Sequence, residues 1–282
     1  MDFLSAATWE DALAAKTEHP EAVPIAGGTD VMVELNFDRR RPPMLLDLTR
    51  VPELTAHGND GELIRIGSGV PYARVITELG KRLPGLAQAS RTVGSPQIRN
   101  RGTIGGNLGS ASPAGDAHPP LLAAGAIVEL ASTRGTRRVP VKEFFTGPKK
   151  SVLAPDELIA AVLLPPAPGP QQFAKVGTRN AMVIAVCSVS VALDAADRSI
   201  GTGIGSAAPT PVSAPAAEAL SHELPWESRG ELPETLARRF GELVAAAASP
   251  IDDVRGTAAY RRQALSVLGR RTLTWAWKEY AA

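Results

Sequence analysis

Short apolar runs separated by turn residues form the pattern of the first 168 residues. A run of this length between Gly, Pro, Asn or Asp is typical of a buried strand. The pattern therefore predicts strands at 23–26, 44–48, 63–67 and 126–130, with a turn at 58–61 between the second strand and the third.

Helices are expected between these strands. Thr8 can cap a helix through residues 9–15, with Asp11 at the capping-box position. Residues 31–35 and 71–79 are also expected to be helical, and residues 119–126 to form a helix or a turn. Prolines at 165, 166, 168 and 170 then predict an extended linker.

The last third of the chain has a different pattern. Residues 183–193 combine a buried run with period-two alternation, which predicts a long strand, and 200–205 is its expected hairpin partner. Helical stretches follow at 214–220, 232–248 and 260–280. We therefore expect three subdomains, at 1–56, 57–168 and 169–282.

Residues 91–116 fit neither the helical nor the alternating pattern. The segment is rich in Gly, Ser and Thr, and it has only two strongly apolar residues after Thr103. We expect a loop over most of its length. The pair Gly105 and Gly106 allows the backbone to approach a ligand closely, and uncharged side chains around the pair can bind phosphate and hydroxyl oxygens.

A second glycine pair lies at residues 26–30, between a predicted strand and a predicted helix. That order directs free backbone N–H groups at a ligand. We call residues 26–30 the first glycine loop and residues 103–107 the second glycine loop. Two such loops facing one cleft can hold a diphosphate with little fixed positive charge. This favours a dinucleotide such as a flavin over a triphosphate with magnesium.

Composition limits the partners, metal sites and membrane segments that can be expected. The net charge of +1 gives no reason to expect nucleic acid or an anionic membrane as a partner. A single cysteine excludes an internal disulfide and an iron–sulfur cluster held by this chain's thiolates alone. The four histidines have no metal-ligand spacing, so no metal site is expected. No apolar stretch approaches ~18 residues, and we expect a cytoplasmic protein without a membrane span.

Other motifs favour structural interpretations. Residues 201–206 resemble a dinucleotide fingerprint, but its third glycine would fall on Ser206, so a glycine-rich strand and turn is expected. Cys187 lies in an apolar run and is expected to be buried and inert. His118 is expected to support the second glycine loop rather than to bind a metal. Arg99 and Arg101 could pair with phosphate or fix the loop to the protein.

Motifs over nearly the whole chain occur here in one combination. They include Ala-Gly-Gly-Thr-Asp at 26–30, Asp-Leu-Thr-Arg-Val-Pro-Glu-Leu at 47–54, Arg-Gly-Thr-Ile-Gly-Gly-Asn at 101–107, Ser-Pro-Ala-Gly-Asp at 112–116 and Tyr-Arg-Arg at 260–262. In this combination the chain resembles the FAD-binding (medium) subunit of the molybdenum hydroxylases, the family of xanthine dehydrogenase and carbon monoxide dehydrogenase. The resemblance implies an α+β fold of the PCMH type (vanillyl-alcohol-oxidase-like). Two α/β subdomains would hold FAD between them, followed by a C-terminal subdomain of antiparallel sheet and helices.

The resemblance also implies which residues bind FAD. Both glycine loops would hold the diphosphate, Asp116 would contact a cofactor hydroxyl, and Ile159 would pack near the adenine. Lys175 and Ile184 would approach the flavin from the third subdomain, while Val93 stands where some relatives carry an aromatic. The full implied set is Pro24, Ile25, Ala26, Gly27, Gly28, Thr29, Asp30, Val31, Thr103, Ile104, Gly105, Gly106, Asn107, Asp116, Ile159, Lys175 and Ile184.

The function implied by the resemblance is electron transfer. A small subunit would carry [2Fe–2S] clusters and a large one the molybdopterin cofactor, in a dimer of heterotrimers. FAD on this chain would collect electrons and pass them to NAD, oxygen, a quinone or another acceptor. An alternative is a free-standing FAD oxidase or dehydrogenase, for which the sequence offers Lys175, Arg179 and Tyr260. A third hypothesis is a non-catalytic nucleotide-binding module.

Overall fold

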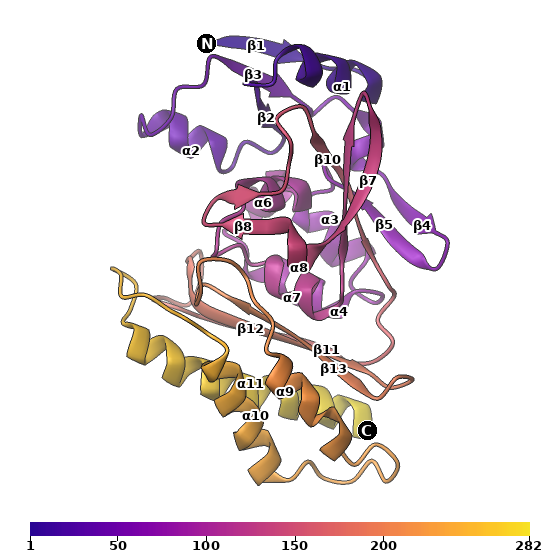
Figure 1. The fold of residues 1–282 in the computed structure, drawn as a ribbon, viewed down its shortest axis with the longest axis vertical. Coiled ribbons are helices and arrows are strands. Elements are labelled where there is room, and N and C mark those ends of the chain that lie inside the picture. The colour runs from indigo at the N-terminus through magenta and orange to yellow at the C-terminus, as the bar shows by residue number, and fades with distance from the viewer.

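The chain folds into three sheet-containing parts that follow one another along its long axis (Figure 1). The structure is a computed structural model, and it describes residues 1–282. The N-terminus lies at one end of the molecule and the C-terminus towards the other. No helix of the chain combines the length and the apolarity needed to cross a membrane. The three-subdomain division expected from the sequence stays a prediction.

The N-terminal part is built on a parallel sheet of three strands in the order β1 (Asp2–Ser5), β3 (Met44–Asp47), β2 (Val23–Ile25). Leu46 of β3 packs with Ala12 of α1 (Trp9–Glu18), whereas its neighbour Leu45 packs with Leu35 of α2 (Val31–Asn36). The two faces of one central strand therefore hold one helix each. A short turn of helix, η1 (Pro52–Thr55), leads into the next part.

The middle part contains an antiparallel sheet of five strands. Their order is β4 (His57–Asp60), β5 (Leu63–Gly67), β10 (Leu158–Leu164), β6 (Ile127–Ser132) and β7 (Gly135–Pro140). Alternate strand residues pack with side chains of the surrounding helices in the largest hydrophobic core of the chain. The helices are α3 (Tyr72–Glu78), α4 (Pro84–Thr92), α5 (Pro96–Arg101), α6 (Ile104–Ser110), α7 (His118–Ala123) and α8 (Val141–Phe144), and a small hairpin of β8 (Phe145–Gly147) and β9 (Lys150–Ser151) follows them.

The C-terminal part has an antiparallel sheet of β11 (Gln171–Gly177), β12 (Ala185–Asp194) and β13 (Ser199–Gly205). Alternate residues of β12, from Cys187 to Leu193, face a core formed with α10 (Glu234–Ala246) and α11 (Ala258–Ala281). Helix α9 (Pro215–Glu218) and the turn η2 (Ala219–Glu223) complete this layer. On β13, a side chain at Gly203 would lie 2.0 Å from the Pro119 carbonyl oxygen, so glycine there lets α7 pack directly on the sheet.

Most predicted elements are present. The Thr8 hydroxyl accepts the Asp11 N–H at 3.1 Å, which confirms the predicted cap of α1. Residues 201–205 lie in β13, which confirms the rejection of a dinucleotide fingerprint there. The turn predicted at 58–61 is wrong for most of its length, because residues 57–60 form β4 and pair with β5.

The loop predicted at 91–116 is also wrong in part. It contains α5 and α6, and Ile104, Gly105 and Leu108 are buried in the first turns of α6. Glycine lowers helix propensity, but the Thr103 hydroxyl caps α6 by accepting the Gly106 N–H at 2.9 Å. Burial of Ile104 and Leu108 in the middle core then stabilises the helix through tertiary packing.

Candidate functional site

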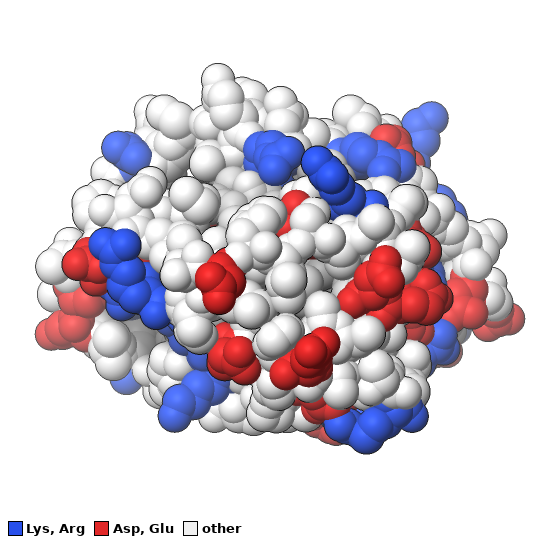
Figure 2. All heavy atoms as spheres, turned by 90° about the horizontal axis from the view of Figure 1, so that it is seen from above, with Lys and Arg blue, Asp and Glu red and all other residues white.

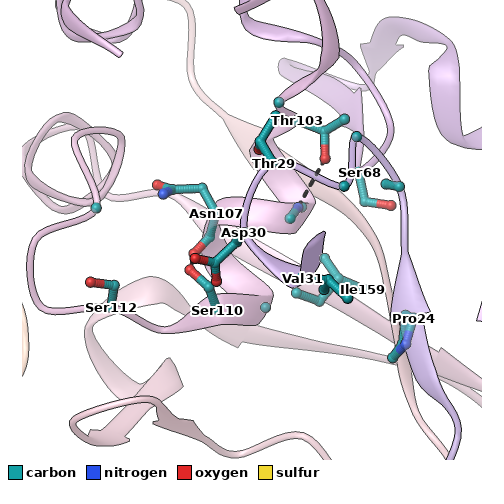
Figure 3. Close-up of a pocket in the computed structure, with 18 of the residues that line it drawn as sticks. Pro24, Thr29, Asp30, Val31, Ser68, Thr103, Asn107, Ser110, Ser112 and Ile159 are labelled. Atoms are coloured by element: carbon teal, nitrogen blue, oxygen red, sulfur yellow. Dashed lines mark hydrogen bonds between the residues drawn. The ribbon is translucent and has the colours of Figure 1, made fainter. Parts of the chain in front are cut away.

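One large pocket opens between the three parts, with a volume of about 780 Å³. Its wall combines both glycine loops, residues 158–159 of β10 and residues 182–184 before β12. Figure 3 shows Thr29 and Asp30 of the first glycine loop beside Thr103 and Asn107 of the second. The structure therefore brings together two glycine loops that lie far apart in the sequence.

The first glycine loop lines this pocket and has backbone donors without a protein partner. No backbone N–H group of residues 26–30 donates to a backbone carbonyl or to a side chain of the protein. All five residues line the pocket, and Gly28 adopts a φ of +74°, which favours glycine. A row of free N–H groups around a cavity is suited to an anionic oxygen ligand. The local prediction of a strand, a glycine turn and a helix is confirmed by β2 and α2.

The second glycine loop differs, because its N–H groups have partners. Gly105 donates to the Ser68 carbonyl at 2.8 Å, Gly106 to the Thr103 hydroxyl, and Asn107 to the Thr103 carbonyl at 3.1 Å. Backbone N–H groups without a protein partner are therefore found in the first loop and not at residues 105–107 of the second. The second loop instead leaves space in the pocket. A Cβ atom at Gly106 would meet only the Thr103 hydroxyl, at 3.1 Å.

Two of the glycines serve contacts within the protein. A Cβ atom at Gly27 would lie 1.8 Å from the carbonyl oxygen of Arg101, so the backbone of the first loop touches the chain two residues before the second loop begins. A Cβ atom at Gly105 would lie 2.3 Å from the Cβ of Ser68. These positions require glycine for packing, whereas Gly106 and Gly109 leave space in the pocket.

Three side chains of the pocket wall have buried polar atoms without a protein partner. They are the Tyr72 hydroxyl, the Asn107 Oδ1 and the Asp116 Oδ1. An unpartnered buried polar group costs roughly 1–3 kcal/mol, so three at one pocket indicate a polar ligand. The sequence analysis identified Asn107 and Asp116 but not Tyr72. In the sequence, Tyr72 looks like an ordinary core residue at the start of a helix.

Asp116 and Lys175 form a buried ion pair at the pocket wall. The Lys175 ammonium donates to Asp116 Oδ2 at 2.5 Å and to the Thr92 carbonyl at 3.1 Å, and the Thr92 hydroxyl donates to the same carboxylate at 3.3 Å. Burial raises the pKa of the Asp116 carboxyl, and Lys175 opposes that rise. Lys175 contacts Asp116 and does not itself line the pocket. Its β11 strand thus supports the wall from the C-terminal part.

Apolar residues complete the wall. Figure 3 places Pro24, Val31 and Ile159 on the same side of the pocket. Ile159 of β10 is buried, whereas Ile184 is 53% exposed among the pocket-lining residues 182–184. Ile25 and Ile104 do not line the pocket; Ile25 packs with the core of the N-terminal sheet, and Ile104 lies in the middle core.

Arg99, His118 and Cys187 each have contacts or burial within the protein. Arg99 donates to the carbonyls of Val93 and Gly94 at 3.1 Å each, so it fixes the chain before α5. Burial lowers the pKa of His118 to about 4, and its Nε2 lies 3.2 Å from the Asn107 carbonyl. Burial raises the pKa of the Cys187 thiol to about 12. No group of three metal-binding side chains is present.

Charge on the face of the molecule around the N-terminal sheet shows no dominant sign. Figure 2 shows Lys and Arg interspersed with Asp and Glu over the end of the molecule that carries the N-terminal sheet. This agrees with the net charge of +1 and gives no field of one sign to attract a polyanion.

Two family models match nearly the whole chain. Residues 1–167 match the family model for the FAD binding domain in molybdopterin dehydrogenase, and residues 172–276 match the CO dehydrogenase flavoprotein C-terminal domain. The nicotine 6-hydroxylase medium subunit of Paenarthrobacter nicotinovorans is 32% identical over 96% of this chain and 95% of the relative. The xanthine dehydrogenase FAD-binding subunit of Escherichia coli O157:H7 is 36% identical over 79% and 81%.

A solved structure has the same fold. A chain of carbon monoxide dehydrogenase from Hydrogenophaga pseudoflava superposes with a TM-score of 0.90 at 25% identity, covering 99% of this chain and 98% of that one. This likeness confirms the α+β fold of the PCMH type that the sequence implied.

Proposed function

The chain belongs to the family of FAD binding domains in molybdopterin dehydrogenases, and we propose that it is the electron-transfer flavoprotein subunit of a heteromeric molybdenum hydroxylase. As a member of this family it is an oxidoreductase component with FAD as its cofactor. In the proposed role it takes electrons from [2Fe–2S] clusters on a small partner subunit and passes them to an external acceptor. The chemistry that FAD supplies when bound is reversible uptake of an electron pair.

The observation that carries the proposal is the row of unused N–H groups at residues 26–30 beside the open wall at Gly106. The N–H groups would bind the diphosphate of FAD, and the glycine wall would let it approach. The unpartnered atoms of Asn107 and Asp116 would bind cofactor hydroxyls or ring atoms. The proposed FAD-binding set is the one implied by the sequence: Pro24, Ile25, Ala26, Gly27, Gly28, Thr29, Asp30, Val31, Thr103, Ile104, Gly105, Gly106, Asn107, Asp116, Ile159, Lys175 and Ile184.

Within this set the roles differ. Ile25, Ile104 and Lys175 would act by holding their neighbours, since they do not line the pocket. Asp116 would orient a hydroxyl while Lys175 holds the carboxylate in place. Ile159 would exclude water from the adenine end, and Ile184 from the flavin end.

The proposed partners are a small iron–sulfur subunit and a large molybdopterin subunit, assembled as a dimer of heterotrimers. The names of the relatives support this, since one is a medium subunit and another an FAD-binding subunit. The substrate of the complex would bind to the large subunit. The external acceptor would be NAD, oxygen, a quinone or another carrier. A cytoplasmic location stays a prediction.

The contacts of three residues disfavour a free-standing oxidase. The Lys175 ammonium is paired with Asp116, and the Arg179 guanidinium donates to the Met182 carbonyl at 3.0 Å through its Nε. Tyr260 is 52% exposed and does not line the pocket. Two of the three acid–base groups that such an oxidase could use are therefore paired within the protein, and the third lies outside the pocket.

The cofactor assignment is tested with Gly106→Val. A branched side chain there would fill the space in front of the second glycine loop, so we expect the purified variant to lose bound FAD while its apoprotein melts near the wild-type temperature. Gly58→Val is the matched control, because a side chain at Gly58 would meet nothing within 4 Å. Full FAD occupancy in Gly106→Val would contradict the assignment.

The subunit assignment is tested by purification of the chain from its native host. We expect two further chains, one with iron and acid-labile sulfide and one with molybdenum. Isolation of a yellow protein alone, with turnover of an organic substrate, would favour the free-standing oxidase instead.

A further inference from the structure

The phenol of Tyr72 is the polar group in the pocket wall that no sequence motif accounts for. Tyr72 is the first residue of α3 and is 2% exposed. Its hydroxyl has no hydrogen-bond partner in the protein, although the residue lines the pocket. Buried tyrosine hydroxyls usually have a partner, so the missing partner points to a molecule bound in the pocket.

Backbone contacts fix the position of this phenol. The Tyr72 N–H donates to the Gly102 carbonyl at 3.0 Å, and Pro71 forms an isolated antiparallel bridge with Thr103. A Cβ atom at Gly102 would lie 3.5 Å from the Tyr72 ring. The ring is therefore held against the residue that precedes the second glycine loop, and it has little freedom to find a partner elsewhere.

Tyr72 and Asp116 both line the pocket, and Asp116 is the charged residue whose field acts on the phenol. Burial, with the nearby charge of Asp116, raises the pKa of Tyr72 well above its usual range, so the phenol keeps its proton and can donate it in a hydrogen bond. Asp116 is bonded to Thr92, next to the pocket residues Val93 and Gly94. By contrast, Lys16 and Pro20 line the pocket from the N-terminal part.

Asp116 Oδ1 does not satisfy the phenol. Both atoms lack a partner, so they are not hydrogen-bonded to each other. A ligand atom near both groups could accept a hydrogen bond from the phenol. The carboxylate could accept one from a ligand hydroxyl.

We propose that Tyr72 binds the cofactor directly, with its hydroxyl donating a hydrogen bond to an oxygen or nitrogen acceptor on the flavin-and-ribityl half of FAD. This rests on the proposed function, since it requires FAD in the pocket. It adds a binding residue that lies outside both glycine loops and outside the set implied by the sequence.

The test is Tyr72→Phe, made in the full chain and stripped of flavin. We expect the Kd for FAD to rise about tenfold, measured by flavin fluorescence titration, because one hydrogen bond is lost. The Kd for FMN should rise by a similar factor. The inhibition constant of ADP, as a competitor of FAD binding, should not change. The apoprotein should melt at or above the wild-type temperature, because its hydroxyl is buried without a partner.

Tyr280→Phe is the matched control. It removes a hydroxyl that donates to the Trp226 carbonyl at 3.3 Å, far from the pocket residues in sequence and outside the pocket lining. This variant should bind FAD like the wild type and lose some apoprotein stability. The opposite signs in the two variants separate a ligand-binding hydroxyl from a structural one.

Three results would overturn the inference. Unchanged FAD affinity in Tyr72→Phe would mean that the ligand does not use the hydroxyl. A lower apoprotein melting temperature, like that of Tyr280→Phe, would mean that the hydroxyl has a water or protein partner. A tenfold increase in the inhibition constant of ADP would place the contact on the ADP half of FAD. Failure of the wild-type chain to bind FAD would instead reject the proposed function.

Discussion

The Lys175 ammonium lies 2.5 Å from the Asp116 carboxylate, across the boundary between the C-terminal sheet and the pocket wall. Their side chains are only 7% and 10% exposed. A buried ion pair of this kind does little for net stability compared with an apolar pair, but removal of one partner leaves a buried charge. The pair therefore makes the shape of the pocket depend on the C-terminal sheet.

Lys175→Met should lower the free energy of unfolding by about 3 kcal/mol at pH 8. Burial already raises the pKa of Asp116, and loss of the ammonium should raise it further. The sign follows from this: the variant's deficit is smallest where Asp116 is protonated and grows as the pH rises through its folded-state pKa. Urea unfolding at pH 5 and pH 8 measures the difference. The double variant Asp116→Asn/Lys175→Met should recover most of the loss, and a single variant as stable as wild type would contradict the argument.

Gly27→Ala should separate the two glycine loops. The new Cβ would lie 1.8 Å from the Arg101 carbonyl oxygen, so the backbone must move. We expect a loss of about 1–3 kcal/mol in stability together with weaker FAD binding. Thermal unfolding of the apoprotein and flavin titration measure the two effects. Gly58→Ala, at an open position, controls for the glycine substitution itself, and a Gly27→Ala protein with normal stability would show that the contact is not tight.

His118 should destabilise the protein in mild acid. Burial lowers its pKa from 6.5 to about 4, so the folded state binds fewer protons than the unfolded state below pH 6.5. Its contribution is fully present above that pH and is lost as the pH falls towards 4, by about 2 kcal/mol between pH 7 and pH 5. His118→Gln keeps a donor near the Asn107 carbonyl but does not titrate. Urea midpoints at both pH values should fall further on acidification for wild type than for the variant; equal falls would contradict the prediction.

Cys187 should not react with disulfide reagents in the native protein. The thiol is buried in the C-terminal core, and burial raises its pKa to about 12, so almost no thiolate forms near neutral pH. We expect no release of chromophore from Ellman's reagent under native conditions and one equivalent per chain in guanidinium chloride. Rapid native reaction would mean that β12 opens easily, and it would reopen the question of a redox role.

Features that depend on neighbouring residues could be predicted from the sequence. The Thr8 cap, the strand and helix on either side of residues 26–30, and the buried strand around Cys187 all follow from local spacing and propensity. The two glycine loops were also evident, and in combination they indicated FAD and the family. The helix α6 was not, because its glycines and serines have low propensity and packing on the middle core stabilises it.

Which polar groups of the pocket have a partner within the protein could be read from the folded chain alone. The N–H groups of residues 26–30 are free, whereas Gly105, in a similar glycine pair, donates to the Ser68 carbonyl. Lys175 turned out to hold Asp116, and the Tyr72 hydroxyl was left without a partner. A sequence specifies donors and acceptors, but whether each has a partner depends on groups brought together from distant segments by packing. That is why the sequence identified the pocket's loops and the fold determined their separate roles.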